Sequence, residues 1–284
     1  MRELAATTHG SELPLLVLPM VDSRTPRLGP FGLALYNALY WPYLLSSLVV
    51  YFVPALLLWL LTVAWDPKRR VLGAYTRWWG AHYLGWAPYA GLRVRGEQHL
   101  AKTTHAIYVS NHLSMVDILA LYALPRPFLW VSKVENFHVP FLGWNMKLNR
   151  YVPLRRGHLP SILRMYRTCL RRLEEGFSLC LFPEGTRSET GLMRHFYPGA
   201  FRLAMRAGVP IVPVVLEGTE RVIAKKRLQI HPEPVTLQIL EPVHPSAFGG
   251  DWRRFADEVR RRMEAAQSEL RVGVRVADDA RRAA

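Results

Sequence analysis

The sequence predicts an α/β fold, with a mixed β-sheet flanked by helices, preceded by an N-terminal hydrophobic helical segment that associates with a membrane. Three observations support this prediction. Short apolar runs typical of strands alternate with helical patterns from about residue 71 onward. A stretch of 38 residues near the N-terminus contains no Asp, Glu, Lys, Arg or His. The residues after 65 carry the whole net charge of +15, because the three arginines and three acidic residues among the first 65 cancel.

The composition bounds the class of protein. The chain has 284 residues, of which 50% are hydrophobic and 21% charged, so it can bury a core and is not disordered throughout. Its only cysteines, Cys169 and Cys180, form no disulfide framework and indicate a reducing compartment. The basic excess attracts anionic lipid, phosphorylated substrates or nucleic acid. We expect no nucleic-acid partner, because the basic residues follow no recognition-helix or aromatic-platform pattern.

The uncharged stretch, Leu28–Trp65, is longer than the roughly 20 residues that cross a hydrocarbon core. It begins too late and is too long for a cleaved signal peptide. Two topologies fit it: one spanning helix kinked at Pro54, or a re-entrant or in-plane helical pair broken near Pro42. The basic residues 68–70 that follow indicate that this end, and the domain after it, lie on the cytoplasmic face.

The organisation of the chain follows from these features. We predict an N-terminal tail over residues 1–27, the hydrophobic segment over 28–70, an α/β domain over 71–273 and a C-terminal tail over 274–284. Five short apolar runs are predicted strands: Ala106–Ser110, Phe128–Val131, Ser178–Phe182, Ile211–Leu216 and Val235–Leu240. Two amphipathic patterns are predicted helices: Ser161–Glu175, with Gly176 as C-cap, and Trp252–Leu270, lying over the domain surface.

The first candidate site is V-S-N-H-L-S-M-V-D, residues 109–117, directly after a predicted strand. His112 then lies in a strand-to-helix turn. If Asp117 lies in the first turn of the helix, its carboxylate can accept a hydrogen bond from one ring nitrogen of His112. The other nitrogen can then take a proton from a substrate, which makes His112 a general base. The spacing Ser114-x-x-Asp117 is also that of a capping box, which explains Asp117 without catalysis.

The second candidate site is L-F-P-E-G-T-R-S, residues 181–188, also directly after a predicted strand. Ligands of α/β folds bind at the carboxyl ends of strands. Glu184 is suited to accept a hydrogen bond from a hydroxyl, and Gly185 lets the backbone approach a ligand. The guanidinium of Arg187 is suited to hold a phosphate. Further basic residues follow other apolar runs, at Lys133 and in R-Y-V-P-L-R-R, residues 150–156.

The ordered motifs N-H-L-S-M-V-D, V-P-L-R-R, F-P-E-G-T-R-S and V-P-I-V-P-V resemble the four conserved blocks of the glycerolipid acyltransferase family. The resemblance covers residues 71–245 and implies that residues 71–273 form an acyltransferase domain. It implies transfer of a fatty acyl group from acyl-CoA or acyl carrier protein to a hydroxyl of a lysophospholipid at the membrane. The acceptor that we expect is 1-acylglycerol 3-phosphate, and the product is then phosphatidic acid for phospholipid biosynthesis.

The resemblance also assigns roles to residues. It implies His112 as the catalytic base and Asp117 as the group that orients it. Substrate binding is implied for six positions: Glu184, Gly185, Thr186, Arg187, Arg156 and, more weakly, Lys133. The family often has an acid where this chain has Arg155, so either Arg155 or Arg156 is the phosphate ligand. No metal or cofactor is expected beyond the acyl donor, because the chain has no H-E-x-x-H motif and no closely paired cysteines.

Other functions fit parts of the same pattern. An acyltransferase could instead use glycerol 3-phosphate, another lysophospholipid or a lyso-aminolipid as acceptor. A non-catalytic lipid-binding membrane protein would retain the fold without turnover. No G-x-S-x-G motif is present, so we expect no acyl-enzyme intermediate.

Overall fold

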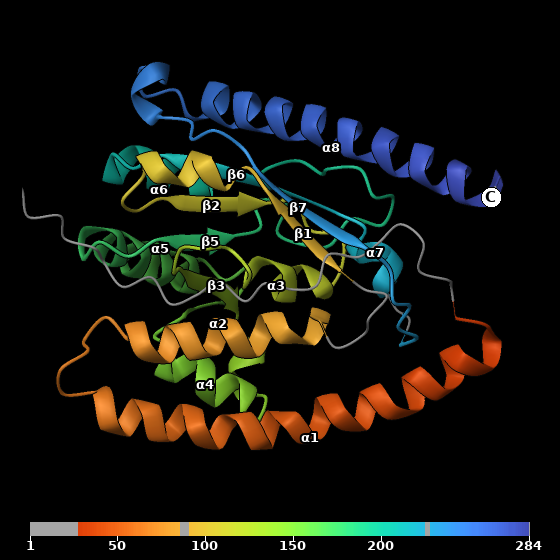
Figure 1. The fold of residues 1–284 in the computed structure, drawn as a ribbon. Helices are drawn as coiled ribbons and strands as arrows, with labels where there is room; N and C mark the ends of the chain where they lie inside the picture. The colour runs from red at the N-terminus through yellow and green to blue at the C-terminus, as the bar shows by residue number, and fades with distance from the viewer. Residues whose placement is uncertain (1–27, 86–90, 225–227, 284) are drawn as a thin grey trace, which may run out of the picture.

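The computed structural model describes residues 28–85, 91–224 and 228–283, so the predicted tail over residues 1–27 lies outside the described part. Its centre is a sheet of seven strands in the order β1-β7-β6-β2-β5-β3-β4. Every neighbouring pair is parallel except β6 and β7, which are antiparallel. The mixed sheet flanked by helices confirms the predicted fold class (Figure 1).

The five predicted strands all form, within two residues of their expected ends. They are β2 (Ile107–Ser110), β3 (Leu129–Lys133), β5 (Leu179–Leu181), β6 (Ile211–Glu217) and β7 (Val235–Ile239). Strands β2 and β6 are buried on both faces along their whole length, as expected for central strands covered by helices on each side. The fourth motif of the resemblance therefore begins the core strand β6.

Two strands and several helices carry too weak a pattern to be predicted. Strand β1 (Leu92–Arg95) alternates buried and exposed side chains at one edge of the sheet, and β4 (Val152–Leu154) has three residues at the other. The helix expected after His112 does form, as α3 (Val116–Leu121), with Asp117 in its first turn. The unpredicted helices are α2 (Arg70–Gly85), α4 (Leu142–Leu148), α6 (Gly199–Ala207) and α7 (Thr219–Val222). Short 3-10 turns occupy Glu97–Lys102, Val134–His138 and Pro245–Phe248.

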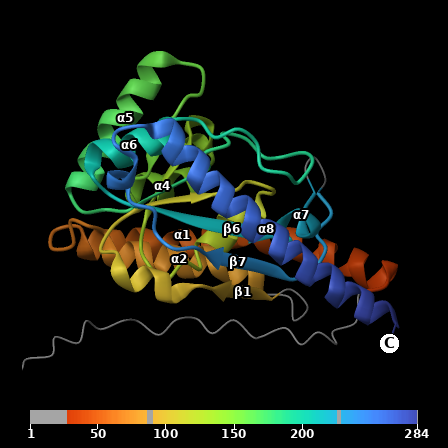
Figure 2. The ribbon, with the colours of Figure 1, turned by 90° about the horizontal axis from the view of Figure 1, so that it is seen from above.

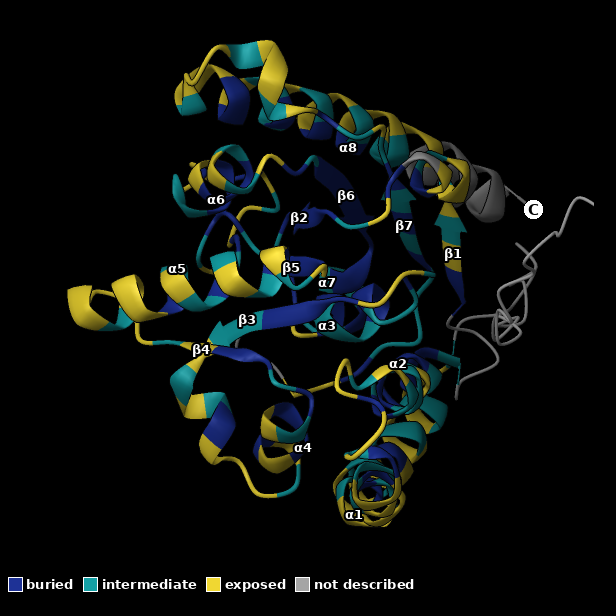
Figure 3. Cartoon of the chain, turned by 90° about the vertical axis from the view of Figure 1, so that its left-hand side faces the viewer, coloured by how far each residue is buried: buried dark blue, intermediate teal, exposed yellow. Residues whose placement is uncertain are grey.

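Helices cover both faces of the sheet (Figures 1 and 3). On one face lie α5 (Leu159–Glu174), α6 and α8 (Trp252–Ala283), and α8 runs obliquely across the molecule in Figure 2. Both predicted helices are thus present, although α8 continues well past the expected end at Leu270. Its buried stripe of Phe255, Val259 and Met263 packs against β6, because these positions recur every four residues.

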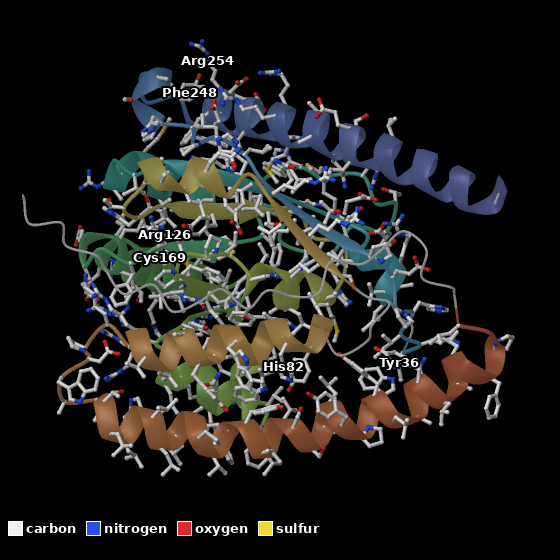
Figure 4. The ribbon with its side chains drawn as sticks, viewed as in Figure 1. Tyr36, His82, Arg126, Cys169, Phe248 and Arg254 are labelled. Atoms are coloured by element: carbon white, nitrogen blue, oxygen red, sulfur yellow. The ribbon has the colours of Figure 1, made fainter. Side chains whose placement is uncertain are left out.

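On the other face, α3 contacts the sheet, α2 packs on α3, and α1 (Pro30–Thr62) packs on α2 and α4. Helix α1 is continuous through both Pro42 and Pro54, so the chain does not break into a pair of helices at Pro42. Figure 4 shows His82 of α2 beside α1, where the Tyr43 hydroxyl lies 2.6 Å from His82 Nε2. Helix α1 is therefore part of the folded domain along one of its faces.

Candidate active site

The topology gathers the predicted motifs at one edge of the sheet. Strands β2, β5, β3 and β4 are adjacent and parallel, so the loops that follow them leave the sheet at the same edge. The loop after β2 carries His112, and the loop after β5 carries residues 182–188. Lys133 ends β3, and Arg155 follows β4. This edge is where ligands bind in open α/β sheets.

His112 and Asp117 form the hydrogen bond that their spacing predicted. His112 Nδ1 lies 2.7 Å from Asp117 Oδ2. Asp117 is fully buried, whereas the His112 side chain is 13% exposed. The imidazole also stacks on the Phe182 ring, with centroids 3.9 Å apart and planes 13° from parallel. The carboxylate therefore binds Nδ1 and leaves Nε2 as the ring nitrogen with which His112 can exchange a proton.

The capping interpretation of Asp117 holds as well. Its Oδ2 accepts hydrogen bonds from the backbone N–H groups of Leu113, at 2.6 Å, and Ser114, at 2.9 Å. The Ser114 hydroxyl donates to the carbonyl of Ile223 and so ties this turn to the end of α7. One carboxylate oxygen thus closes the strand-to-helix turn and orients the histidine within it.

Glu184 holds the backbone of His112 in place. Its Oε1 accepts from the His112 N–H at 2.9 Å, and its Oε2 accepts from the Arg194 N–H at 2.9 Å. On the other side of the same residue, the Ser188 N–H donates to the His112 carbonyl at 2.7 Å. Glu184 is 1% exposed, and burial raises the pKa of its carboxyl, an effect that the two backbone hydrogen bonds oppose.

At Gly185, which was expected to let the backbone approach a ligand, the backbone lies close to the side chain of Tyr197. Its φ is +68°, which favours glycine, and a Cβ at this position would lie 3.0 Å from the Tyr197 ring. The Tyr197 N–H in turn donates to the Pro183 carbonyl at 2.8 Å. The tight turn at Gly185 therefore carries the chain from buried Glu184 to exposed Thr186 and half-buried Arg187.

The other predicted basic residues lie along the same edge of the sheet and do not join the hydrogen-bonded cluster of His112 in the described part of the chain. Lys133 is half exposed and pairs with Glu135 at 3.3 Å. Arg155 and Arg156 are both exposed on the loop between β4 and α5. The structure thus brings His112, Asp117 and Glu184 together and places Lys133 and Arg155 after strands that end at the same edge of the sheet.

Several residues of the site were not predicted. Phe182 supplies the ring under His112, and its place at the end of an apolar run beside the motif was the available signal. Asn111 exchanges two hydrogen bonds with the backbone of Leu216, which fixes the end of β2 against β6. Arg194 contributes its backbone N–H. A backbone contact ten residues from its partner has no signature in the sequence.

The geometry defines a class of protein. A histidine that is oriented by a buried carboxylate through one ring nitrogen can deprotonate a hydroxyl group with the other. Among the described residues, no group of three or more His, Cys, Asp or Glu side chains is placed to hold a metal ion. Cations at the same edge can bind an anionic substrate. This is an α/β site suited to base-assisted group transfer to a hydroxyl-bearing anion.

Comparisons with known proteins place the chain within this class. A sequence model of the acyltransferase family matches residues 91–217. The 1-acyl-sn-glycerol-3-phosphate acyltransferase of Haemophilus influenzae is 30% identical over 184 residues, which are 63% of this chain and 74% of the relative. A protein of the same name from Chlamydomonas reinhardtii is 34% identical over 209 residues. That match covers 72% of this chain but only 62% of the algal protein.

A solved structure agrees with these matches. The crystal structure of the 1-acyl-sn-glycerophosphate acyltransferase of Thermotoga maritima superposes with a TM-score of 0.72 at 26% identity, covering 84% of this chain and 98% of that one. The chain belongs to the acyltransferase family, as the four motifs in its sequence indicated.

Proposed function

We propose that the protein transfers a fatty acyl group from a thioester to the free hydroxyl of 1-acylglycerol 3-phosphate, giving phosphatidic acid. The hydrogen bond between His112 and buried Asp117, at the edge of the sheet that also carries the basic residues, is the observation that supports this most directly. The names of the relatives indicate the acceptor. The donor is acyl-CoA or acyl carrier protein.

In the proposed mechanism, His112 Nε2 takes the proton of the acceptor hydroxyl as its oxygen attacks the thioester carbonyl. Asp117 stabilises the imidazolium that forms. The tetrahedral intermediate then collapses, the C–S bond breaks, and the thiolate takes the proton back from His112. An ester and a free thiol result, and no acyl-enzyme is needed, since a thioester is already a good electrophile.

The acceptor phosphate needs cations, and we assign these to Arg187 and to one of Arg155 and Arg156, with Lys133 further along the edge. Arg187 follows Glu184, which binds the backbone of His112, by three residues. Since Glu184 is buried and both its oxygens accept from backbone N–H groups, we propose that it shapes the acceptor loop from within. We also assign to Thr186, which is exposed beside Gly185, a contact with the acceptor.

Label transfer from acyl-CoA and from acyl carrier protein to 1-acylglycerol 3-phosphate in detergent micelles tests the function. The chain should form phosphatidic acid with at least one donor, and His112→Ala should lower the rate by roughly 10²- to 10⁴-fold, the range of general base catalysis. If no phosphatidic acid forms with either donor, the proposed acceptor is wrong. Glycerol 3-phosphate and other lysolipids would then be tested.

We further propose that α1 lies in one leaflet of a membrane, parallel to its plane, with the domain on the cytoplasmic face. Helix α1 is long and apolar enough to cross a membrane. One face is docked on the domain: Asn37 bonds the backbone of Ile230, and Phe52 packs edge-on against Phe141 and Trp144. The opposite face exposes large apolar side chains, among them Phe31, Leu35, Leu45, Val50, Leu57 and Leu61. A helix docked along its length cannot leave the domain to cross a bilayer without breaking these contacts.

A further inference from the structure

Two side chains of the C-terminal helix α8, Arg271 and Gln267, bind the turn around Gly191 in the loop that follows β5. Arg271, on α8, donates from Nη2 to the carbonyl of Gly191 at 2.6 Å, and its Nε lies 3.1 Å from Glu217 Oε2. Gln267, one turn earlier, also donates to the Gly191 carbonyl, at 3.3 Å. Glu217 ends β6 and is 4% exposed. Arg271 therefore pairs with a buried carboxylate and also donates a hydrogen bond to the carbonyl of the turn.

The Gly191 turn is built to receive this side chain. Gly191 has a φ of +78°, and a Cβ there would lie 3.0 Å from Arg271 Nη2. The turn is closed from within, because the Ser188 hydroxyl donates to the carbonyl of Leu192 at 2.7 Å. Arg271 and Gln267 therefore hold this turn against α8, and Arg271 makes the shorter of the two hydrogen bonds.

The same segment contacts His112 from both sides. The Ser188 N–H, just before the turn, binds the His112 carbonyl. The Arg194 N–H, just after it, binds Glu184, which binds the His112 N–H. Strand β2 lies between β6 and β5 in the sheet, so Arg271 links the strand on one side of β2 to the loop that follows the strand on the other. His112 follows β2, the strand between the two that Arg271 connects.

We infer that Arg271 is a positioning residue for the acyl transfer, acting through the Gly191 turn to hold the backbone of His112. It does not contact His112, so its removal should change turnover through geometry. A displacement of about 1 Å in a catalytic group can cost up to roughly 10²-fold in rate. This inference rests on the proposed role of His112 as the base.

The kinetic test compares Arg271→Ala with Arg261→Ala, a matched control on the same helix. Arg261 is 69% exposed and pairs with Glu258 of its own helix. We expect Arg271→Ala to lower kcat by roughly 10-fold or more, with the KM of either substrate changed by less than about 2-fold, because the acceptor cations stay in place. Guanidinium added at a non-denaturing concentration should restore part of kcat. Arg261→Ala should match the native chain and show no restoration.

Arg271→Lys separates positioning from folding. A lysine keeps the positive charge beside Glu217 but cannot bond the carboxylate and the Gly191 carbonyl with a planar fork, so kcat should fall between the native and alanine values. If Arg271→Ala does not fold, the lysine variant decides: native kcat there overturns the inference. Native kcat in a folded Arg271→Ala variant also overturns it.

Hydrogen exchange separates this inference from the proposed function. Backbone amides over residues 184–195 should exchange faster in Arg271→Ala than in the native chain, and at the native rate in Arg261→Ala. This expectation does not depend on whether phosphatidic acid is formed. Unchanged exchange in this segment overturns the inference. Absence of turnover by the native chain, with the exchange difference present, overturns the proposed function instead.

Discussion

At the scale of the residue, the site depends on carboxylates that bind more than one partner. Asp117 Oδ2 is shared by the imidazole of His112 and two backbone N–H groups, and its burial keeps water from replacing any of them. Glu184 likewise binds two backbone N–H groups, those of His112 in the loop after β2 and of Arg194 in the loop after β5. Each carboxylate therefore holds the backbone near His112 in place, and Asp117 also orients the imidazole. Conservative substitutions distinguish these two contributions.

Asp117→Asn should abolish most turnover while the turn persists. The asparagine oxygen can still accept from the N–H groups of Leu113 and Ser114, but an amide does not stabilise an imidazolium as a carboxylate does. We expect kcat to fall by roughly 10²- to 10⁴-fold. Steady-state transfer assays measure this, and circular dichroism should show an unchanged fold. A variant that keeps half the native kcat would remove Asp117 from the mechanism.

Glu184 should make the free energy of unfolding depend on pH. Burial raises the pKa of its carboxyl in the folded state, so the folded protein binds this proton more tightly than the unfolded chain. Its contribution to stability is then fully present below the unfolded pKa, near 4.5, and is lost as pH rises through the higher folded pKa. Urea unfolding in mild detergent across this range should show a steeper fall for the native chain than for Glu184→Gln. Parallel curves would contradict the prediction.

At the scale of the element, α1 has two faces with different partners. Its inner side packs on α2 and α4 through Tyr40, Phe52 and Ala55, all buried. Its outer side is exposed, as the yellow surface of α1 in Figure 3 shows. With a rise of 1.5 Å per residue, its 33 residues extend about 50 Å, which exceeds the roughly 30 Å of a hydrocarbon core. Length and one-sided docking both favour an orientation within the leaflet.

Depth measurements on single cysteines should show that orientation. A nitroxide or fluorophore at Leu35→Cys, Val49→Cys and Leu60→Cys, all exposed positions on α1, should report similar, shallow depths in vesicles. The native thiols should not react, because both are buried, and burial raises the pKa of Cys169 to about 12. A spanning helix would instead place residue 49 deepest, with the two ends near opposite surfaces.

At the scale of the whole molecule, α8 connects the core to the active-site edge. Its first half is buried on the sheet, where Phe255 stacks on Phe248 at 4.9 Å and meets Phe201 edge-on at 5.7 Å. Its later turns carry Gln267 and Arg271 to the Gly191 turn. The helix thus supports the global fold with one part and the local geometry of the site with another.

The two parts of α8 should respond differently to substitution. Phe255→Ala removes a fully buried ring and should lower the free energy of unfolding by about 3–5 kcal/mol. Arg260→Ala breaks an exposed ion pair with Glu264 and should change it by less than about 0.5 kcal/mol. Urea unfolding followed by tryptophan fluorescence measures both. Equal stabilities for the two variants would show that α8 does not anchor the core.

The central strands β2, β5 and β6 could be predicted from short continuous apolar runs, because strands covered by helices on both faces are apolar on both. Strands β1 and β4 could not, since they are short edge strands whose pairing comes from their neighbours. Helix α2 also lacked a clear pattern. Its buried residues face α1 on one side and α3 on another, so its apolar stripe is broad and irregular.

The sequence alone was enough to predict the family, the His112–Asp117 pair and the apolar segment, because each depends on residue types within short motifs, where the chain itself brings the groups together. The tertiary structure decided what depends on distant segments. Only the packing of strands and helices shows that Glu184 binds the backbone of His112, 72 residues away, that Arg271 reaches Gly191, and that α1 is docked along one face. Contacts between backbone groups, or between segments joined only by folding, leave no local pattern in the sequence, because any residue can supply an N–H or a carbonyl.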